Sequence, residues 1–300
     1  MYVVTGASGN TGSVVARKLL DSGKQVRVIG RNTDHLREFT NRGAEAAIIN
    51  MTEAAKLARA FQGAEAVYAM IPPNPSEADI YGYDERITTA LVSALTNAHV
   101  TRVVSLSSIG AEKSSGTGLV VGLYHLEQAL NSVAGLNVLH LRAGYFMENT
   151  LVQAGIIAAM GRTAGPLRAD LKLPMIASRD IGAHAADALL HPDFTGHQVR
   201  ELHGQRDITY AEATSVIGQA INQPGLQYTQ LPDDQLRPAL SKLGMSPNFI
   251  DLLLKMSEAL NSGFMRAQEP RTPQNTTSTS YESFVVEKFV PAYQQTRRAA

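Results

Sequence analysis

The chain has 300 residues, and 44% of them are hydrophobic, which is enough to bury a sizeable core in one or two domains. Lysine and arginine number 27, as do aspartate and glutamate, so no overall basic field marks a dedicated nucleic-acid binder. Cysteine is absent, which excludes disulfides, thiolate nucleophiles and cysteine-ligated metals, and we expect no metal site.

The chain opens on an apolar, strand-like run at residues 1–4. No apolar stretch approaches the roughly 18 residues that span a bilayer. We therefore expect a cytoplasmic protein without a leader or a membrane segment. The sequence leaves the oligomeric state open.

Short apolar runs alternate with amphipathic stretches over the first half of the chain, which is the pattern of βαβ units. The predicted strands cover residues 2–5, 25–30, 44–49, 66–71, 102–106 and 137–141. The predicted helices cover residues 11–22, 33–42, 52–62, 84–97 and 118–128. Because each strand is followed by a crossover long enough for a helix, we predict an α/β fold with a doubly wound parallel sheet of the Rossmann type.

The pattern becomes less regular beyond about residue 150. Helices are predicted at residues 180–190, 209–221, 235–243 and 248–261, and short strands near residues 173–177, 199–203 and 226–231. We interpret residues 1–150 as a Rossmann domain and residues 151–300 as a smaller, mostly helical α+β lobe with a C-terminal tail, from which later segments return to the sheet. Polar residues 268–280 predict an extended surface loop, and apolar residues 281–293 predict a tail that docks on the body.

Three glycines, Gly6, Gly9 and Gly12, lie at a spacing of three between the first strand and the first helix. Gly6 permits a tight turn, Gly9 lets a pyrophosphate approach the backbone, and Gly12 lets the helix pack on the strand. The N–H groups at the start of the helix then face the anion. This turn predicts a bound dinucleotide. The neighbouring side chains that can donate further hydrogen bonds are Ser8, Asn10 and Thr11.

The end of the second strand indicates which dinucleotide is bound. Proteins that bind NAD usually carry an acid here, which bonds the ribose 2′-hydroxyl, whereas this chain has Arg31 and Asn32 after Gly30. A guanidinium pairs with a 2′-phosphate through two hydrogen bonds, and an acid would repel it. Arg31 therefore predicts NADP(H) in preference to NAD(H), held by residues 1–150; the alternative is a solvated arginine at a loop edge.

Four further segments follow the glycine turn in a characteristic order, at residues 30–32, 69–73, 105–111 and 141–149. Together with the turn they resemble the NmrA-like branch of the atypical short-chain dehydrogenase/reductases, from residue 1 to about residue 190. The resemblance implies that Asn50 and Met51 lie beside the adenine and that Ser107 contacts the cofactor. It also implies a ribose and nicotinamide wall made of Met70, Ile71, Pro72, Pro73, Tyr145 and Phe146. Simple packing remains the alternative for the two aromatic side chains.

Active members of the wider superfamily carry a Tyr-x-x-x-Lys pair on the helix after the fifth strand, where lysine lowers the pKa of the proton-donating tyrosine. Here Tyr124 is followed four residues later by Gln128, and Leu123 stands where many NmrA-like relatives keep a lysine. Tyr124 is the catalytic candidate and His125 a possible substitute, with plain packing as the alternative. We interpret Asp180 as a helix N-cap.

Two functions remain open. The first is an NADPH-dependent oxidoreductase that acts on a small carbonyl or quinone substrate, which the C-terminal lobe favours. The second is a non-catalytic NADP(H) redox sensor that acts through protein–protein contacts, which the missing lysine favours. The same missing pair argues against a third function, that of an epimerase or isomerase. The expected partner is a small-molecule substrate or a regulatory protein, and neither nucleic acid nor a membrane is expected.

Overall fold

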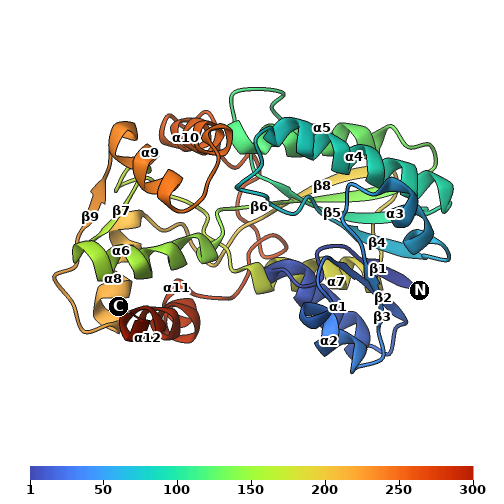
Figure 1. The fold of residues 1–300 in the computed structure, drawn as a ribbon, viewed down its shortest axis with the longest axis horizontal. Helices are drawn as coiled ribbons and strands as arrows, with labels where there is room; N and C mark the ends of the chain where they lie inside the picture. Colours follow the sequence, from blue (N-terminus) through green and yellow to red (C-terminus); the bar gives the residue numbers. More distant parts are fainter. Residues whose placement is uncertain (300) are drawn as a thin grey trace.

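A parallel sheet of seven strands forms the larger part of the protein, in the order β3-β2-β1-β4-β5-β6-β8. The computed structural model that gives this fold describes residues 1–299. In Figure 1 the sheet with its helices lies on the right and a smaller lobe on the left. The strands of the sheet are β1 (Tyr2–Val4), β2 (Val26–Gly30), β3 (Glu45–Ile48), β4 (Ala66–Ala69), β5 (Arg102–Ser108), β6 (Asn137–Ala143) and β8 (His197–Leu202).

The strand order reverses at β1, since β2 and β3 lie on one side of it and β4 to β6 on the other. All six pairings of this sheet are parallel. This confirms the predicted doubly wound, Rossmann-type sheet. In such sheets ligands bind beyond the carboxyl ends of the strands near the point of reversal.

Helices cover both faces of the sheet, each through its own buried apolar cluster. One face carries α1 (Asn10–Asp21), α2 (Thr33–Thr40) and α7 (Ser178–Leu190), and the other carries α3 (Ala54–Phe61), α4 (Ile80–Asn97) and α5 (Val121–Asn131). Helix α4 begins one turn earlier than predicted. The Asp79 carboxylate accepts a hydrogen bond from the Gly82 N–H and so caps that extra turn.

The smaller lobe is built around a third apolar cluster and a two-stranded parallel sheet of β7 (Thr163–Gly165) and β9 (Tyr228–Gln230). Its helices are α6 (Gln153–Met160), α8 (Tyr210–Ala220), α9 (Asp233–Lys242), α10 (Pro247–Asn261), α11 (Tyr281–Phe284) and α12 (Val290–Ala299). Short helical turns of other types are η1 (Gly118–Val120), η2 (Met147–Val152) and η3 (Val285–Phe289). Among residues 1–299, no helix has the length and apolar character needed to cross a bilayer.

Two segments after residue 150 return to the large sheet, because β8 pairs with β6 and α7 packs against α1. The strand predicted at residues 173–177 is wrong. Only single bridges form there, from Leu173 to Ile208 and from Phe146 to Ile176, and Pro174 between them has no N–H to extend a ladder.

The tail from residue 268 onward differs from its prediction in one part. Residues 268–280 are not simply a surface loop, because Asn275, Thr277 and Thr279 are buried. The Asn275 side chain accepts from the Thr272 N–H and donates to a backbone carbonyl, so its polar atoms need no water. The tail beyond docks on the body as predicted, with Phe284 and Phe289 buried in the core of the smaller lobe.

Candidate functional site

The glycine turn disfavours side chains at two of its three glycines, at Gly6 through its left-handed backbone and at Gly12 through lack of space. Gly6 has a φ of +59°, and a Cβ there would lie 2.6 Å from the Met70 sulfur. A Cβ on Gly12 would lie 2.3 Å from the Gly6 carbonyl oxygen, so any side chain would push α1 away from β1. The Gly9 N–H donates to the Gly6 oxygen at 2.9 Å and closes the turn. Helix α1 then begins with neither a side-chain cap nor an acidic residue in its first turn, which leaves its N–H groups facing outward.

A cavity of about 220 Å³ lies over this turn, and we call it the glycine-turn cavity. It combines the ends of β1 to β4, as expected for a binding site at the carboxyl edge of the sheet. Most of the residues predicted to bind the dinucleotide line it. These are Gly6, Ser8, Gly9, Arg31, Asn50, Met51, Met70, Pro72 and Pro73.

Arg31 lies at the rim of the glycine-turn cavity, directly after β2. Within residues 1–299 its guanidinium forms neither an ion pair nor a side-chain hydrogen bond with the protein, so all its donors are available. Its neighbour Asn32 does not line the cavity. The Asn32 side chain accepts from the Asp34 N–H and caps α2.

The other predicted contacts have visible structural roles. The Thr11 hydroxyl is buried and accepts a 2.8 Å hydrogen bond from Tyr68, so it ties α1 to β4. Ile71 packs on the core under α3 and α4. The Ser107 hydroxyl donates to Glu127 at 2.6 Å. The predicted residues outside the lining of the glycine-turn cavity are Asn10, Thr11, Gly12, Asn32, Ile71, Ser107, Tyr145 and Phe146.

A second cavity, of about 400 Å³, lies between the carboxyl ends of β5, β6 and β8 and the smaller lobe; we call it the cross-lobe cavity. Tyr145 and Phe146 line it, so the structure places both predicted aromatic residues in a cavity wall. Its apolar wall is completed from distant parts of the chain. The residues that do so are Ile109, Leu171, Leu173, Pro174, Met256, Leu260 and Met265.

The hydroxyl of Tyr145 is already engaged. It lies 2.8 Å from the hydroxyl of Tyr210, and the two rings meet edge to face. Burial raises the pKa of both phenols, so each stays neutral at ordinary pH. This pair fixes the ring of Tyr145 in the wall of the cross-lobe cavity.

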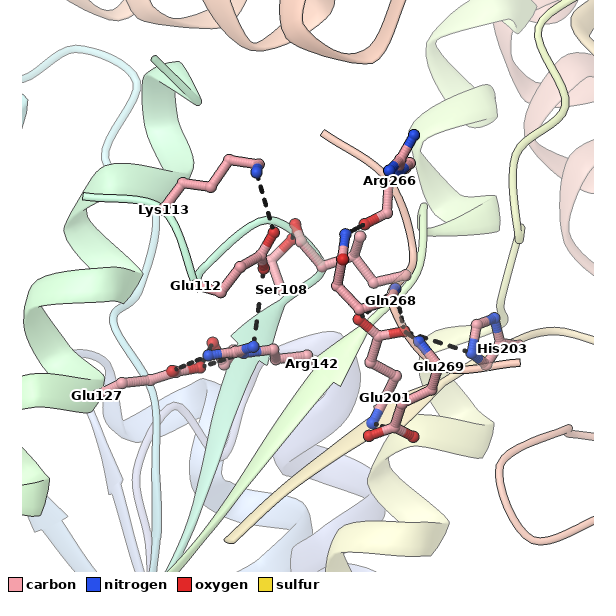
Figure 2. Close-up of polar contacts among 12 residues, drawn as sticks. Ser108, Glu112, Lys113, Glu127, Arg142, Glu201, His203, Arg266, Gln268 and Glu269 are labelled. Atoms are coloured by element: carbon pink, nitrogen blue, oxygen red, sulfur yellow. Dashed lines mark hydrogen bonds and ion pairs between the residues drawn. The ribbon is translucent and has the colours of Figure 1, made fainter. Parts of the chain in front are cut away.

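A row of polar residues crosses the sheet beneath the cross-lobe cavity, with Ser107 of β5, Arg142 of β6 and Glu201 of β8 in register. Arg142 forms a bidentate pair with the buried carboxylate of Glu127, at 3.0 and 2.6 Å, and lies 3.7 Å from Glu112. Figure 2 shows this network. Glu127, whose carboxylate is bound by the guanidinium of Arg142 and the hydroxyl of Ser107, lies on α5. This is the helix that carries the Tyr-x-x-x-Lys pair in active members of the superfamily.

Tyr124 lines neither of the two cavities, and its ring packs edge to face on His125 with 5.2 Å between the centroids. Its catalytic role therefore stays a prediction. Leu123, at the position of the absent lysine, packs among apolar side chains of two core clusters. Since it carries no donor, that position adds no charge to the site.

The interpretation of Asp180 as an N-cap is wrong. Helix α7 begins two residues earlier, at Ser178, and the Ser178 N–H donates to the carboxylate of Glu148 instead. The Asp180 carboxylate accepts hydrogen bonds from the N–H and the hydroxyl of Thr279. Glu148 of η2 therefore caps α7, and Asp180 binds Thr279 of the tail.

Sequence reasoning missed two buried polar residues near the cross-lobe cavity, Glu201 and His203. The sequence did contain a signal for them. Glu201 and His203 are two residues apart in the strand predicted at residues 199–203, so they share one side of it, where apolar side chains are expected. A buried acid and a buried histidine on one side of a strand end are typical of a site rather than of a core.

The comparisons with known proteins agree with this architecture. The chain is 29% identical over 283 residues to a (4-alkanoyl-5-oxo-2,5-dihydrofuran-3-yl)methyl phosphate reductase of Streptomyces griseus, covering 92% of this chain and 93% of that protein. It is 27% identical over 255 residues to an NAD(P)H azoreductase of Xenophilus azovorans, covering 84% and 85%.

Among solved structures, an NADPH-dependent quinone oxidoreductase from Escherichia coli, complexed with NADPH, matches with a TM-score of 0.76 at 20% identity. The match covers 100% of this chain and 99% of that one, and it supports the Rossmann-type fold. The sequence model of the NmrA-like family matches residues 2–279, nearly the whole chain. The protein therefore belongs to the NmrA-like family.

Proposed function

We propose that this protein is an NADPH-dependent oxidoreductase that reduces a small carbonyl or quinone substrate. The observation that carries the proposal is the pairing of two cavities at one edge of the sheet. The glycine-turn cavity suits a dinucleotide, and the largely apolar cross-lobe cavity suits a small substrate. The reductase names of two relatives support the same class of reaction.

The residues of the glycine-turn cavity fit NADPH. Gly9 keeps the backbone bare where a pyrophosphate needs close approach, Gly6 and Gly12 permit the tight turn and the close packing of α1, and α1 presents free N–H groups to the anion. Arg31 has its donors available for a 2′-phosphate. Asn50 and Met51 line the part of the cavity proposed for the adenine, and Met70, Pro72 and Pro73 the part proposed for the ribose. When bound, the cofactor supplies a hydride.

The substrate would lie in the cross-lobe cavity beside Tyr145 and Phe146. Apolar walls exclude water from a hydride transfer and favour a flat, weakly polar acceptor. Quinones and aldehydes meet this description. The name of the structurally similar quinone oxidoreductase points the same way.

The test is to mix purified protein with NADPH and either menadione or benzaldehyde, and to follow the loss of reduced-nicotinamide absorbance. Turnover of at least one acceptor is expected. Calorimetry run in parallel measures the affinities for NADPH, NADP⁺ and NADH, and NADPH should bind more tightly than NADH.

The sensor alternative is favoured by one observation, the apolar Leu123 where a lysine would assist proton transfer. It predicts no turnover of either acceptor, together with clearly different affinities for NADPH and NADP⁺. That combination of results would overturn the oxidoreductase proposal.

A further inference from the structure

His203 lies at the carboxyl end of β8 and lines the cross-lobe cavity. Its side chain is almost fully buried, with 3% of the residue exposed. The tail holds its backbone on both sides, since the His203 N–H donates to the Asn275 carbonyl at 2.7 Å and its own carbonyl accepts from the Thr277 N–H at 2.9 Å. The backbone that carries the imidazole is therefore held in place at the cavity wall.

The ring nitrogen Nε2 of His203 is buried and has no hydrogen-bond partner among residues 1–299. A buried polar atom without a partner costs stability, and most such atoms in proteins are paired. His140, the other histidine buried to this degree, has both ring nitrogens bonded, to Ser105 at 2.7 Å and to Asn131 at 2.9 Å. His203, by contrast, lines a cavity: its Nε2 is buried beside Glu201, and its other ring nitrogen, Nδ1, makes no hydrogen bond within residues 1–299 and is available to a ligand.

A buried carboxylate stands next to the imidazole. The Oε2 atom of Glu201 lies 3.7 Å from Nε2 of His203, as drawn in Figure 2. The Glu201 oxygens accept hydrogen bonds of 2.9 to 3.0 Å from the N–H groups of Gln268 and Glu269, which fix the carboxylate in place. A fixed carboxylate beside an imidazole orients the ring and stabilises its protonated form.

The other proton carriers in the cavity wall are less suited to this role. Of its two carboxylates, Asp207 is ion-paired with Arg271, and Glu269 accepts a hydrogen bond from the Glu201 N–H. The Tyr145 hydroxyl is bonded to Tyr210, and burial raises its pKa. The Ser108 hydroxyl donates to the Ile109 carbonyl at 3.0 Å. Lys172 is on the exposed rim. Histidine is also the side chain whose ordinary pKa is nearest to neutral.

We infer that His203 is the proton donor for the acceptor reduced in the cross-lobe cavity, with Glu201 as its positioning residue; this rests on the proposed function. In the reduction of a carbonyl, the carbon gains the hydride and the π electrons of the C=O bond move to oxygen. The oxygen takes a proton from the His203 imidazolium, which becomes imidazole and is reprotonated from solvent. The acceptor gains two electrons and the nicotinamide loses two, so the step balances.

The charged groups around His203 set the direction of its pH dependence. Burial lowers its pKa below the ordinary value, and the nearby Arg271 lowers it further, while Asp207 and Glu269 act in the opposite sense. Glu201 faces it from the same strand. Since the imidazolium is the donor, kcat/KM should fall as pH rises through this lowered pKa.

The test compares His203→Gln, which keeps a hydrogen-bonding side chain but cannot titrate, with His140→Gln, a buried histidine outside the cavity. His203→Gln should lower kcat for benzaldehyde by about 100-fold and abolish the pH dependence. NADPH affinity should be unchanged in both variants, and His140→Gln should keep the kinetics of the wild type. Glu201→Gln should lower the pKa of His203, measured by NMR of histidine-labelled protein, and shift the pH profile by the same amount.

A second readout does not depend on turnover. With NADP⁺ present, benzyl alcohol, the product expected from benzaldehyde, should shift the His203 ring resonances and leave those of His140 in place. A His203→Gln variant with unchanged kcat and pH profile, or ring resonances that ignore benzyl alcohol, would overturn the inference while leaving the reductase proposal intact. A wild-type protein that reduces neither acceptor would instead overturn the reductase proposal, and this inference with it.

Discussion

The two cavities share one edge of the sheet but are assembled in opposite ways. The glycine-turn cavity takes all its lining from residues 6–83, in consecutive strand ends, the loops that follow them and Tyr83 of α4. The cross-lobe cavity takes its lining from segments scattered between Ser108 and Arg271. The first is therefore set mainly by local backbone geometry, and the second by how distant segments pack. Damage to one should leave the other largely intact.

The largest effect is expected from Gly12→Ala, which tests the backbone geometry of the glycine-turn cavity. Its Cβ would lie 2.3 Å from the carbonyl oxygen and 2.8 Å from the carbonyl carbon of Gly6, so α1 has to move. We expect a loss of about 3 kcal/mol or more in the free energy of unfolding, and no measurable NADPH binding by calorimetry.

The matched control is Gly155→Ala, another glycine within a helix, where a Cβ meets nothing within 4 Å. That change should raise stability by about 0.5–1 kcal/mol and leave NADPH affinity unchanged. Normal NADPH binding by Gly12→Ala would show that the glycine-turn cavity does not depend on the close packing of Gly12 against Gly6.

The next effect comes from Glu127→Leu, near the cross-lobe cavity. It removes the bidentate partner of Arg142, whose side chain is only 13% exposed. Leaving a buried guanidinium without its partner should cost about 3 kcal/mol, measured by urea denaturation. The double variant Glu127→Leu with Arg142→Met should recover part of that loss. NADPH affinity should stay within about twofold of the wild type in both, since neither residue lines the glycine-turn cavity.

Arg31→Asp sharpens the assignment of the glycine-turn cavity. Replacing the guanidinium by a carboxylate should weaken NADPH binding by about 10- to 100-fold in calorimetry and change NADH binding by less than about threefold. Arg59→Asp, on α3 outside the cavity, makes the same change in charge and serves as the control. Equal weakening of NADPH and NADH by Arg31→Asp would refute the 2′-phosphate contact.

The smallest effect concerns Asp84, on α4, which lines neither cavity. Burial, with help from Asp79, raises its pKa from 3.8 to about 7. A raised carboxyl pKa stabilises the fold at low pH and loses that contribution as pH rises towards about 7. Asp84→Asn should therefore increase stability at about pH 8 by about 1 kcal/mol, with less gain at about pH 4 and unchanged NADPH affinity. A gain that is equal at both pH values would contradict the shifted pKa.

The sequence was sufficient to predict strands β1 to β6 and much of the glycine-turn cavity. Short apolar runs located β1 to β6 to within a few residues, and Gly23 marked the end of α1. Nine of the residues predicted to bind the dinucleotide line one cavity, because the turn, Arg31 and Asn50 all lie at successive strand ends. The strand order itself was not predicted, because a βαβ pattern fits more than one doubly wound order.

The cross-lobe cavity could not be predicted in the same way. His203 and Glu201 gain their roles from Asn275, Gln268 and Glu269, which are more than sixty residues away in the chain. The polar composition of residues 268–280 indicated a surface loop, because composition does not reveal that neighbouring backbone groups satisfy those side chains. The role of Tyr124 stays a prediction.

The clamp that Asn275 and Thr277 place on the backbone of His203 also sets an order of events during synthesis. A nascent chain can form β1 to β4 and the turn over them while translation continues. The cross-lobe cavity lacks this support until residues 275–277 have been made. The wall of that cavity is therefore completed later in synthesis than the glycine turn.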